Sequence, residues 1–97
     1  MKINILNQDY EIILNADIEK DFEEYGKDGI CNISEHKIAI DKSCPDWAKA
    51  YTLRHEIIHA FLKESGYIDL YQNEPFVSIL AMKLPYLVQI LNKLKAM

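Results

Sequence analysis

The residues with the clearest chemical potential are His55, Glu56 and His59, which form a His-Glu-x-x-His motif. On a helix of 3.6 residues per turn, the two histidines lie about 40° apart around the axis and about one turn apart along it. Two imidazoles on one face can bind a single zinc ion at about 2.0–2.1 Å each. Glu56 borders the same face, so it can take a proton from a metal-bound water without being a ligand.

A third protein ligand is expected, because catalytic zinc usually has three and leaves the fourth position to water. After His59, the acidic, histidine and cysteine side chains are Glu64, Asp69 and Glu74. Glu64 lies about 140° around the helix from His59 and is expected to point away. The segment 66–72 can reach roughly 23 Å, enough to return the chain to the histidine face, so Glu74 is the expected ligand. The alternatives are Asp69, His36, Cys31 and Cys44.

Each of these assignments has a simpler competitor. The two histidines can make only hydrogen bonds on a polar helix face, and Glu74 can serve only to complement a helix dipole. The helical context and the two apolar residues Ile57 and Ile58 inside the motif favour the metal site.

Two helices must position these side chains. Ser43 and Asp46 match a capping box with Pro45 in the first turn, which predicts a helix that runs to Ser65 and ends at Gly66. Ala60 is small, as close packing behind the metal requires. Aromatic residues on and near this helix are expected to be core or helix-contact residues: Trp47, Tyr51, Phe61 and Phe76.

The last helix is predicted to begin with Asn73 as its cap and Pro75 in its first turn. Pro85 lies inside it and is expected to kink it. Apolar residues run nearly all round this helix over residues 76–91, so we expect it to be mostly buried.

The first half of the chain predicts strands. Residues 2–6 and 10–14 alternate around Asn7-Gln8-Asp9, which indicates a hairpin, and residues 29–33 and 37–41 form a second strand pair. Ile38 and Ile40 share one face of their strand. Between the pairs we expect a short helix, capped by Asn15 or Asp17, that ends at Gly26. The expected fold is α+β: a small, mainly antiparallel sheet followed by two longer helices.

Composition limits the classes of function. The 97 residues allow one domain, residues 1–97. The net charge of −4 offers no basic stripe, which argues against a nucleic-acid partner. The beginning of the sequence turns polar too soon for a signal peptide. The apolar stretch 76–91 is interrupted by Ser78, Lys83 and Gln89, so we expect no membrane span.

The two cysteines, Cys31 and Cys44, do not form a disulfide framework or a Cys-x-x-Cys pair. We therefore expect free thiols in a cytoplasmic protein. The oligomeric state is left open.

The stretch from Thr52 to Ala60, followed by Asn73-Glu74, resembles the gluzincin clan of zinc metallopeptidases. It is most similar to the minimal gluzincins (minigluzincins) and to the ImmA/IrrE-like peptidases of prophages and Gram-positive bacteria. The resemblance extends from about Gly29 onward. The metzincin pattern does not fit, because it needs glycine and a third histidine where this chain has Leu62 and Ser65.

The resemblance implies a Zn²⁺-dependent peptidase with His55, His59 and Glu74 as ligands and Glu56 as general base. It also implies that a peptide or protein substrate pairs with the strand before the active helix, Lys37 to Asp41, as a sheet edge. The competing interpretation is an ordinary edge strand whose end charges, Lys37 and Asp41, prevent pairing with another strand. A repressor-cleaving regulatory protease fits the same resemblance.

The chain departs from thermolysin-like members at Ser78, where those proteins have an acidic residue that orients the first histidine; serine lacks the charge. No oxyanion-stabilising residue is assigned, although Tyr67 and Tyr71 lie in the relevant loop. The rival function is a non-catalytic or latent, zinc-stabilised regulatory module of phage origin. Glu56 separates the two, because a purely structural site has no use for it.

Overall fold

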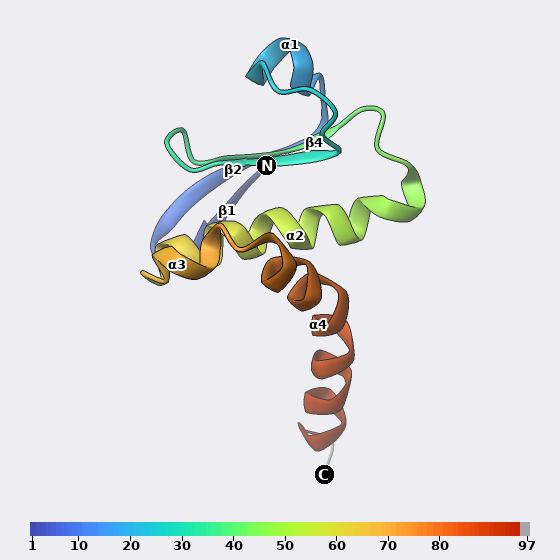
Figure 1. Ribbon diagram of the computed structural model, residues 1–97. Helices are drawn as coiled ribbons and strands as arrows, with labels where there is room; N and C mark the ends of the chain where they lie inside the picture. Colours follow the sequence, from blue (N-terminus) through green and yellow to red (C-terminus); the bar gives the residue numbers. More distant parts are fainter. Residues whose placement is uncertain (96–97) are drawn as a thin grey trace.

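The computed structural model describes residues 1–95 and confirms the α+β fold class (Figure 1). The single-domain prediction covers residues 1–97, of which residues 96 and 97 lie outside the described part. The elements in chain order are β1 (Lys2–Ile5), β2 (Gln8–Ala16), α1 (Ile18–Phe22), β3 (Gly29–Asn32), β4 (Lys37–Asp41), α2 (Asp46–Glu64), α3 (Ile68–Tyr71) and α4 (Glu74–Lys95).

The strands form one mixed sheet in the order β1-β2-β4-β3. Both predicted strand pairs are confirmed: β1 pairs with β2 and β3 pairs with β4, each antiparallel. The first turn is Leu6-Asn7 rather than the expected Asn7-Gln8-Asp9, with φ values of 49° and 72°, as a two-residue hairpin turn requires. β2 and β4 pair in parallel, so the sheet is mainly rather than wholly antiparallel.

The expectation that Lys37 to Asp41 is a sheet edge is wrong. β4 pairs with β2 on one side and with β3 on the other, so the open edges are β1 and β3. The continuous buried run Ile38-Ala39-Ile40 is typical of an inner strand, and it outweighs the charges at the two ends.

α2 runs along one face of the sheet, and the short α1 lies over one end of the other face (Figure 1). Ile38 and Ile40 share a face as predicted: Ile38 packs with Ala60 of α2, and Ile40 packs with Ala48 near the start of α2. Ala39 points to the opposite face, where it packs with Ile18 of α1. Ala60 is fully buried against the sheet, which explains its small size.

The helix ends differ in part from expectation. Asp17 caps α1, accepting a hydrogen bond from the Lys20 backbone, but α1 ends at Phe22 because Glu23 adopts φ 56°, well before Gly26. The capping box at the start of α2 is wrong. The N-cap is Pro45, without a side-chain hydrogen bond, because the Ser43 hydroxyl donates to the Asp41 carboxylate instead.

The prediction that α4 is mostly buried is wrong. Only Val77 and Ala81 are fully enclosed, in a cluster with Ile58 and Leu62 of α2. The second half of the helix extends away from the body of the molecule (Figure 1), and its large apolar side chains are 37–63% exposed within residues 1–95. Two of the expected core aromatics are also exposed: Trp47 (86%) and Phe61 (48%).

Pro85 leaves one backbone carbonyl of α4 without its intrahelical hydrogen bond, and a side chain of α2 donates to this carbonyl. Proline has no N–H, so the carbonyl of Ala81, four residues earlier, loses its intrahelical partner. The Arg54 Nε donates to this carbonyl at 2.9 Å. The guanidinium therefore joins α2 to α4 beside the first motif histidine.

We expect Arg54→Ala to lower the free energy of unfolding by about 1–3 kcal/mol, because the Ala81 carbonyl would lose a charged donor. The cost should be smaller in a Pro85→Ala background, where the substituted alanine supplies the missing N–H. Urea denaturation of the four proteins of this double-mutant cycle measures the coupling. An equal cost of Arg54→Ala in both backgrounds would show that Arg54 does not act through this carbonyl.

Candidate metal centre

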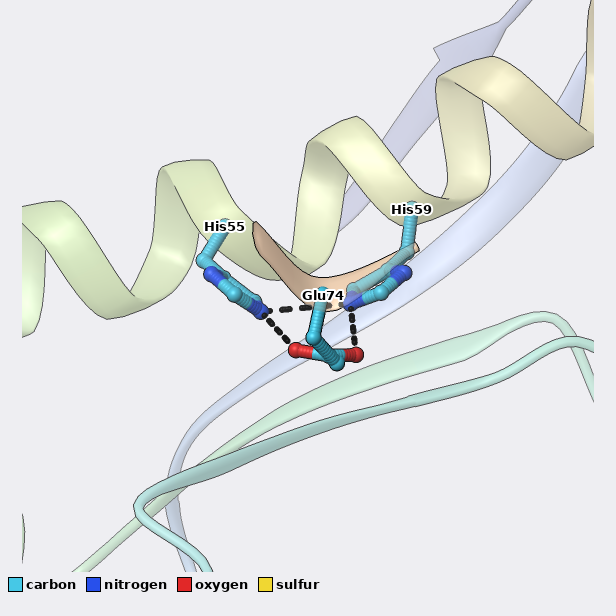
Figure 2. Close-up of side chains that lie close together, drawn as sticks. All are labelled: His55, His59 and Glu74. Carbon is cyan, nitrogen blue, oxygen red and sulfur yellow. Dashed lines mark hydrogen bonds and ion pairs between the residues drawn. The ribbon is translucent and has the colours of Figure 1, made fainter. Parts of the chain in front are cut away.

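The structure brings His55, His59 and Glu74 together, although Glu74 comes from a different helix (Figure 2). The His55 Nε2 lies 2.9 Å from one carboxylate oxygen of Glu74, and the His59 Nε2 lies 2.9 Å from the other. The two Nε2 atoms are 3.2 Å apart. One ligand atom from each residue fits within 4.8 Å of the others, so this group could hold a metal ion.

The return of the chain from α2 to the histidine face depends on two turns. Gly66, at φ 85°, ends α2 as predicted: its N–H bonds to Lys63 O, and the next N–H bonds to Leu62 O. After the single turn of α3, the Asn73 side chain caps α4 as predicted, accepting from the Phe76 backbone at 3.1 Å. Glu74 follows the cap directly, so its carboxylate is placed at the first turn of α4.

The alternative ligands lie elsewhere. Glu64 points away as expected and accepts a hydrogen bond from the Tyr10 hydroxyl at 2.8 Å. His36 lies in the β3–β4 turn with its ring against Tyr10. Asp69 is in α3, and neither it nor a cysteine joins the group of three. Both cysteines are free, as predicted: Cys31 and Cys44.

The two histidines are held differently. The Nδ1 of His59 faces the Tyr71 carbonyl. A carbonyl only accepts, so this nitrogen carries the proton and leaves the Nε2 lone pair free for a metal. The Nδ1 of His55 is buried and has no hydrogen-bond partner among the described residues. Ser78 therefore does not replace the missing acidic residue.

Glu56 is 9% exposed and borders an open cleft of about 700 Å³ beside the three converging residues. Burial raises the pKa of its carboxyl group to about 7, the negative charge of Glu74 adds to the rise, and Lys27 opposes it. A carboxyl group with this pKa can both accept and release a proton near neutral pH.

The cleft has a second wall that sequence reasoning missed. Gly29, Ile30 and Cys31 of β3 line it, together with Thr52 of α2. Burial raises the pKa of the Cys31 thiol to about 12, and the charge of Glu56 contributes, so this thiol stays protonated. Of the two tyrosines considered for the oxyanion, Tyr71 lines the cleft, whereas Tyr67 is not part of its lining and is 59% exposed.

Gly29 allows β3 to approach α2 closely. A Cβ at this position would lie 2.6 Å from the Thr52 Cγ2 and 3.2 Å from the Glu56 Cγ. Glycine is thus required by space, and the spacing of β3 from Glu56 depends on it.

We expect Gly29→Ala to destabilise the protein by about 1–3 kcal/mol, because Thr52 is buried and its branched side chain has little freedom to move. Thermal unfolding measures the loss. Adding Thr52→Ser removes the clashing methyl group and should restore most of the stability. No recovery in the double variant would contradict this steric account.

Comparison of the chain with protein-family models, with curated proteins and with solved structures gives no match.

Proposed function

We propose that the protein is a zinc-dependent metallopeptidase of the gluzincin type. The observation that carries this proposal is the convergence of His55, His59 and Glu74 from two helices, beside the buried carboxyl group of Glu56. His55, His59 and Glu74 would hold the zinc ion, and Glu56 would act as the general base.

The donor set fits zinc in type and spacing. Two imidazole nitrogens and one carboxylate are a common ligand set of catalytic zinc, with one position left open. Zinc–ligand distances of 2.0–2.1 Å imply ligand atoms about 3.3 Å apart in a tetrahedron. With one Glu74 oxygen as the ligand, its distance to the nearer histidine nitrogen is 2.9 Å, and the two imidazole nitrogens are 3.2 Å apart, both close to this value.

The chemistry follows from the placement of the side chains. Zinc, when bound, lowers the pKa of a coordinated water toward 7 and polarises a carbonyl group. Glu56 takes the proton released at the attacking water and then delivers it to the leaving amine. The Tyr71 carbonyl keeps His59 in the tautomer that exposes Nε2 toward the ligand group.

The open sheet edge beside the cleft is β3, so we place the proposed substrate peptide alongside β3 and not alongside β4. The Asp41 N–H bonds to Asp28 O at 2.7 Å. By the alternation of an antiparallel ladder, the backbone groups of Gly29 and Cys31 then point away from β4. An extended peptide could pair with these groups while it crosses the cleft above Glu56. A cytoplasmic peptide or protein is the proposed substrate class.

Peptide cleavage by the zinc-loaded protein tests the proposal. Incubation with a mixed peptide library, followed by mass spectrometry of new termini, should reveal cleavage products. These products should be absent when Glu56→Gln replaces the wild type. One bound zinc per chain without any cleavage would instead favour the zinc-stabilised regulatory module.

A further inference from the structure

The second half of α4 is an apolar surface without a partner among residues 1–95. α4 has 22 residues with a mean hydropathy of 1.3 in its most apolar stretch, of which 11% is buried, so it is long and apolar enough to cross a membrane. Core helices of soluble proteins can have the same length and composition, so these two properties do not by themselves indicate a membrane span. The exposed large apolar side chains, each 37–63% exposed, are Ile79, Met82, Leu84, Tyr86, Leu87, Val88, Ile90, Leu91 and Leu94.

These side chains continue a contact that the chain already makes. Val77 and Leu80 pack against α2 in the cluster around Ile58 and Leu62. The same 3–4 spacing then continues along α4 beyond the body, with a period of 3.5 residues, which is the pattern of a helix–helix seam. Four leucines at this spacing form what we call the α4 seam: Leu84, Leu87, Leu91 and Leu94.

We propose that the α4 seam packs, antiparallel, against the α4 seam of a second copy of this chain. The antiparallel direction follows from α2. Because α2 covers the seam side of α4 at Val77 and Ala81, a parallel helix in register would collide with it. In the antiparallel pair, Leu84 faces Leu94 of the second copy and Leu87 faces its Leu91. The second half of each α4 then contacts only the second half of the other α4 and does not reach the other copy's α2.

Charge supports this arrangement. All 15 acidic residues lie within residues 1–74, whereas the charged residues of α4 after Glu74 are Lys83, Lys93 and Lys95. An antiparallel pair brings the lysine-bearing end of each α4 toward the acidic body of the other copy. In this register Val88 and Ile90 flank the seam at its centre, so the contact there is apolar.

The exposed apolar area along the seam is that of a small interface. The four seam leucines, with Val88 and Ile90 on the flanks, are 37–58% exposed and amount to on the order of 500 Å² per chain, at the low end of specific protein–protein interfaces. A lipid bilayer fits less well, because Lys83 lies in the middle of α4 and would have to enter the hydrocarbon region.

Sedimentation equilibrium of the full chain tests the proposal. The wild type should have about twice the 11.3 kDa chain mass. Leu87→Glu with Leu91→Glu should raise the dimer dissociation constant at least about 100-fold, since charges would enter the seam centre. The matched control, Gln89→Glu with Asn92→Glu, adds the same charges off the seam and should remain dimeric. Both leucines are half-exposed in one copy, so the folded monomer should persist, as circular dichroism would show.

A monomeric wild type at about 100 µM would overturn the proposal. Equal weakening by both double variants would also overturn it, because the seam would then have no special role. A monomer that co-sediments with phosphatidylglycerol vesicles would assign the surface to a membrane instead. None of these measurements depends on peptidase activity, so the proposal stands or falls separately from the metal centre.

Discussion

Replacing Glu56 with glutamine is expected to lower peptide hydrolysis by about 10²–10⁴-fold while one zinc ion per chain is retained. The amide keeps the shape of the side chain but cannot accept the proton from the attacking water. Because Glu56 is not in the ligand group, metal content should not change. Steady-state cleavage of a peptide found in the library, with zinc analysis of both proteins, measures the two effects.

Glu24→Gln is the matched control, because Glu24 lines the same cleft but is exposed. It should cleave at a rate close to that of the wild type.

Glu56→Gln should also change the pH dependence of stability in the metal-free protein. The folded state raises the pKa of Glu56 from 4.5 to about 7, so it holds the proton more tightly than the unfolded chain. Wild-type stability should therefore fall as pH rises from 4.5 to 7, and the variant should lack this component. Unchanged activity in Glu56→Gln would remove the general base from the mechanism.

Loss of a metal ligand should have the second large effect. Wild-type protein should contain about one zinc ion per chain, and His59→Ala and Glu74→Ala should each lose most of it. At zinc concentrations about 1,000 times the dissociation constant, binding adds about 4 kcal/mol to the stability of the folded state. For a domain of this size, chelation should therefore lower the Tm by roughly 15–30 °C.

Asp69→Ala serves as the control, because Asp69 is the next candidate for the third ligand and lies outside the converging group. It should keep its zinc and its chelator-sensitive Tm. Retention of zinc by Glu74→Ala would show that Glu74 is not a ligand. A Tm insensitive to chelation in the wild type would show that no metal supports the fold.

Local signals predict much of this site. The spacing of His55 and His59 places both on one helix face, and Gly66 and Asn73 mark the turns that bring Glu74 back. These features depend on a few neighbouring residues, so they can be inferred from a single sequence.

The errors concern contacts between distant segments. The inner position of β4 depends on its parallel pairing with β2, which no local pattern of β4 specifies. The Ser43 cap failed because Asp41 competes for its hydroxyl. The wall formed by Gly29 was missed because only the folded chain brings it against Glu56. For α4, an apolar surface on all sides predicts burial, whereas its large apolar side chains stay about half-exposed among residues 1–95.

The link between Arg54 and the Ala81 carbonyl also sets the alignment of the two helices. Arg54 precedes the first metal-binding candidate on α2, and Ala81 lies about two turns after Glu74 on α4. These two points of attachment fix both the sliding and the rotation of α4 along α2. A single residue inserted between Glu74 and Ala81 would turn one end by about 100° relative to the other. Such a chain could keep the Glu74 carboxylate beside the two histidines, or it could keep the hydrogen bond from Arg54 to the Ala81 carbonyl, but not both.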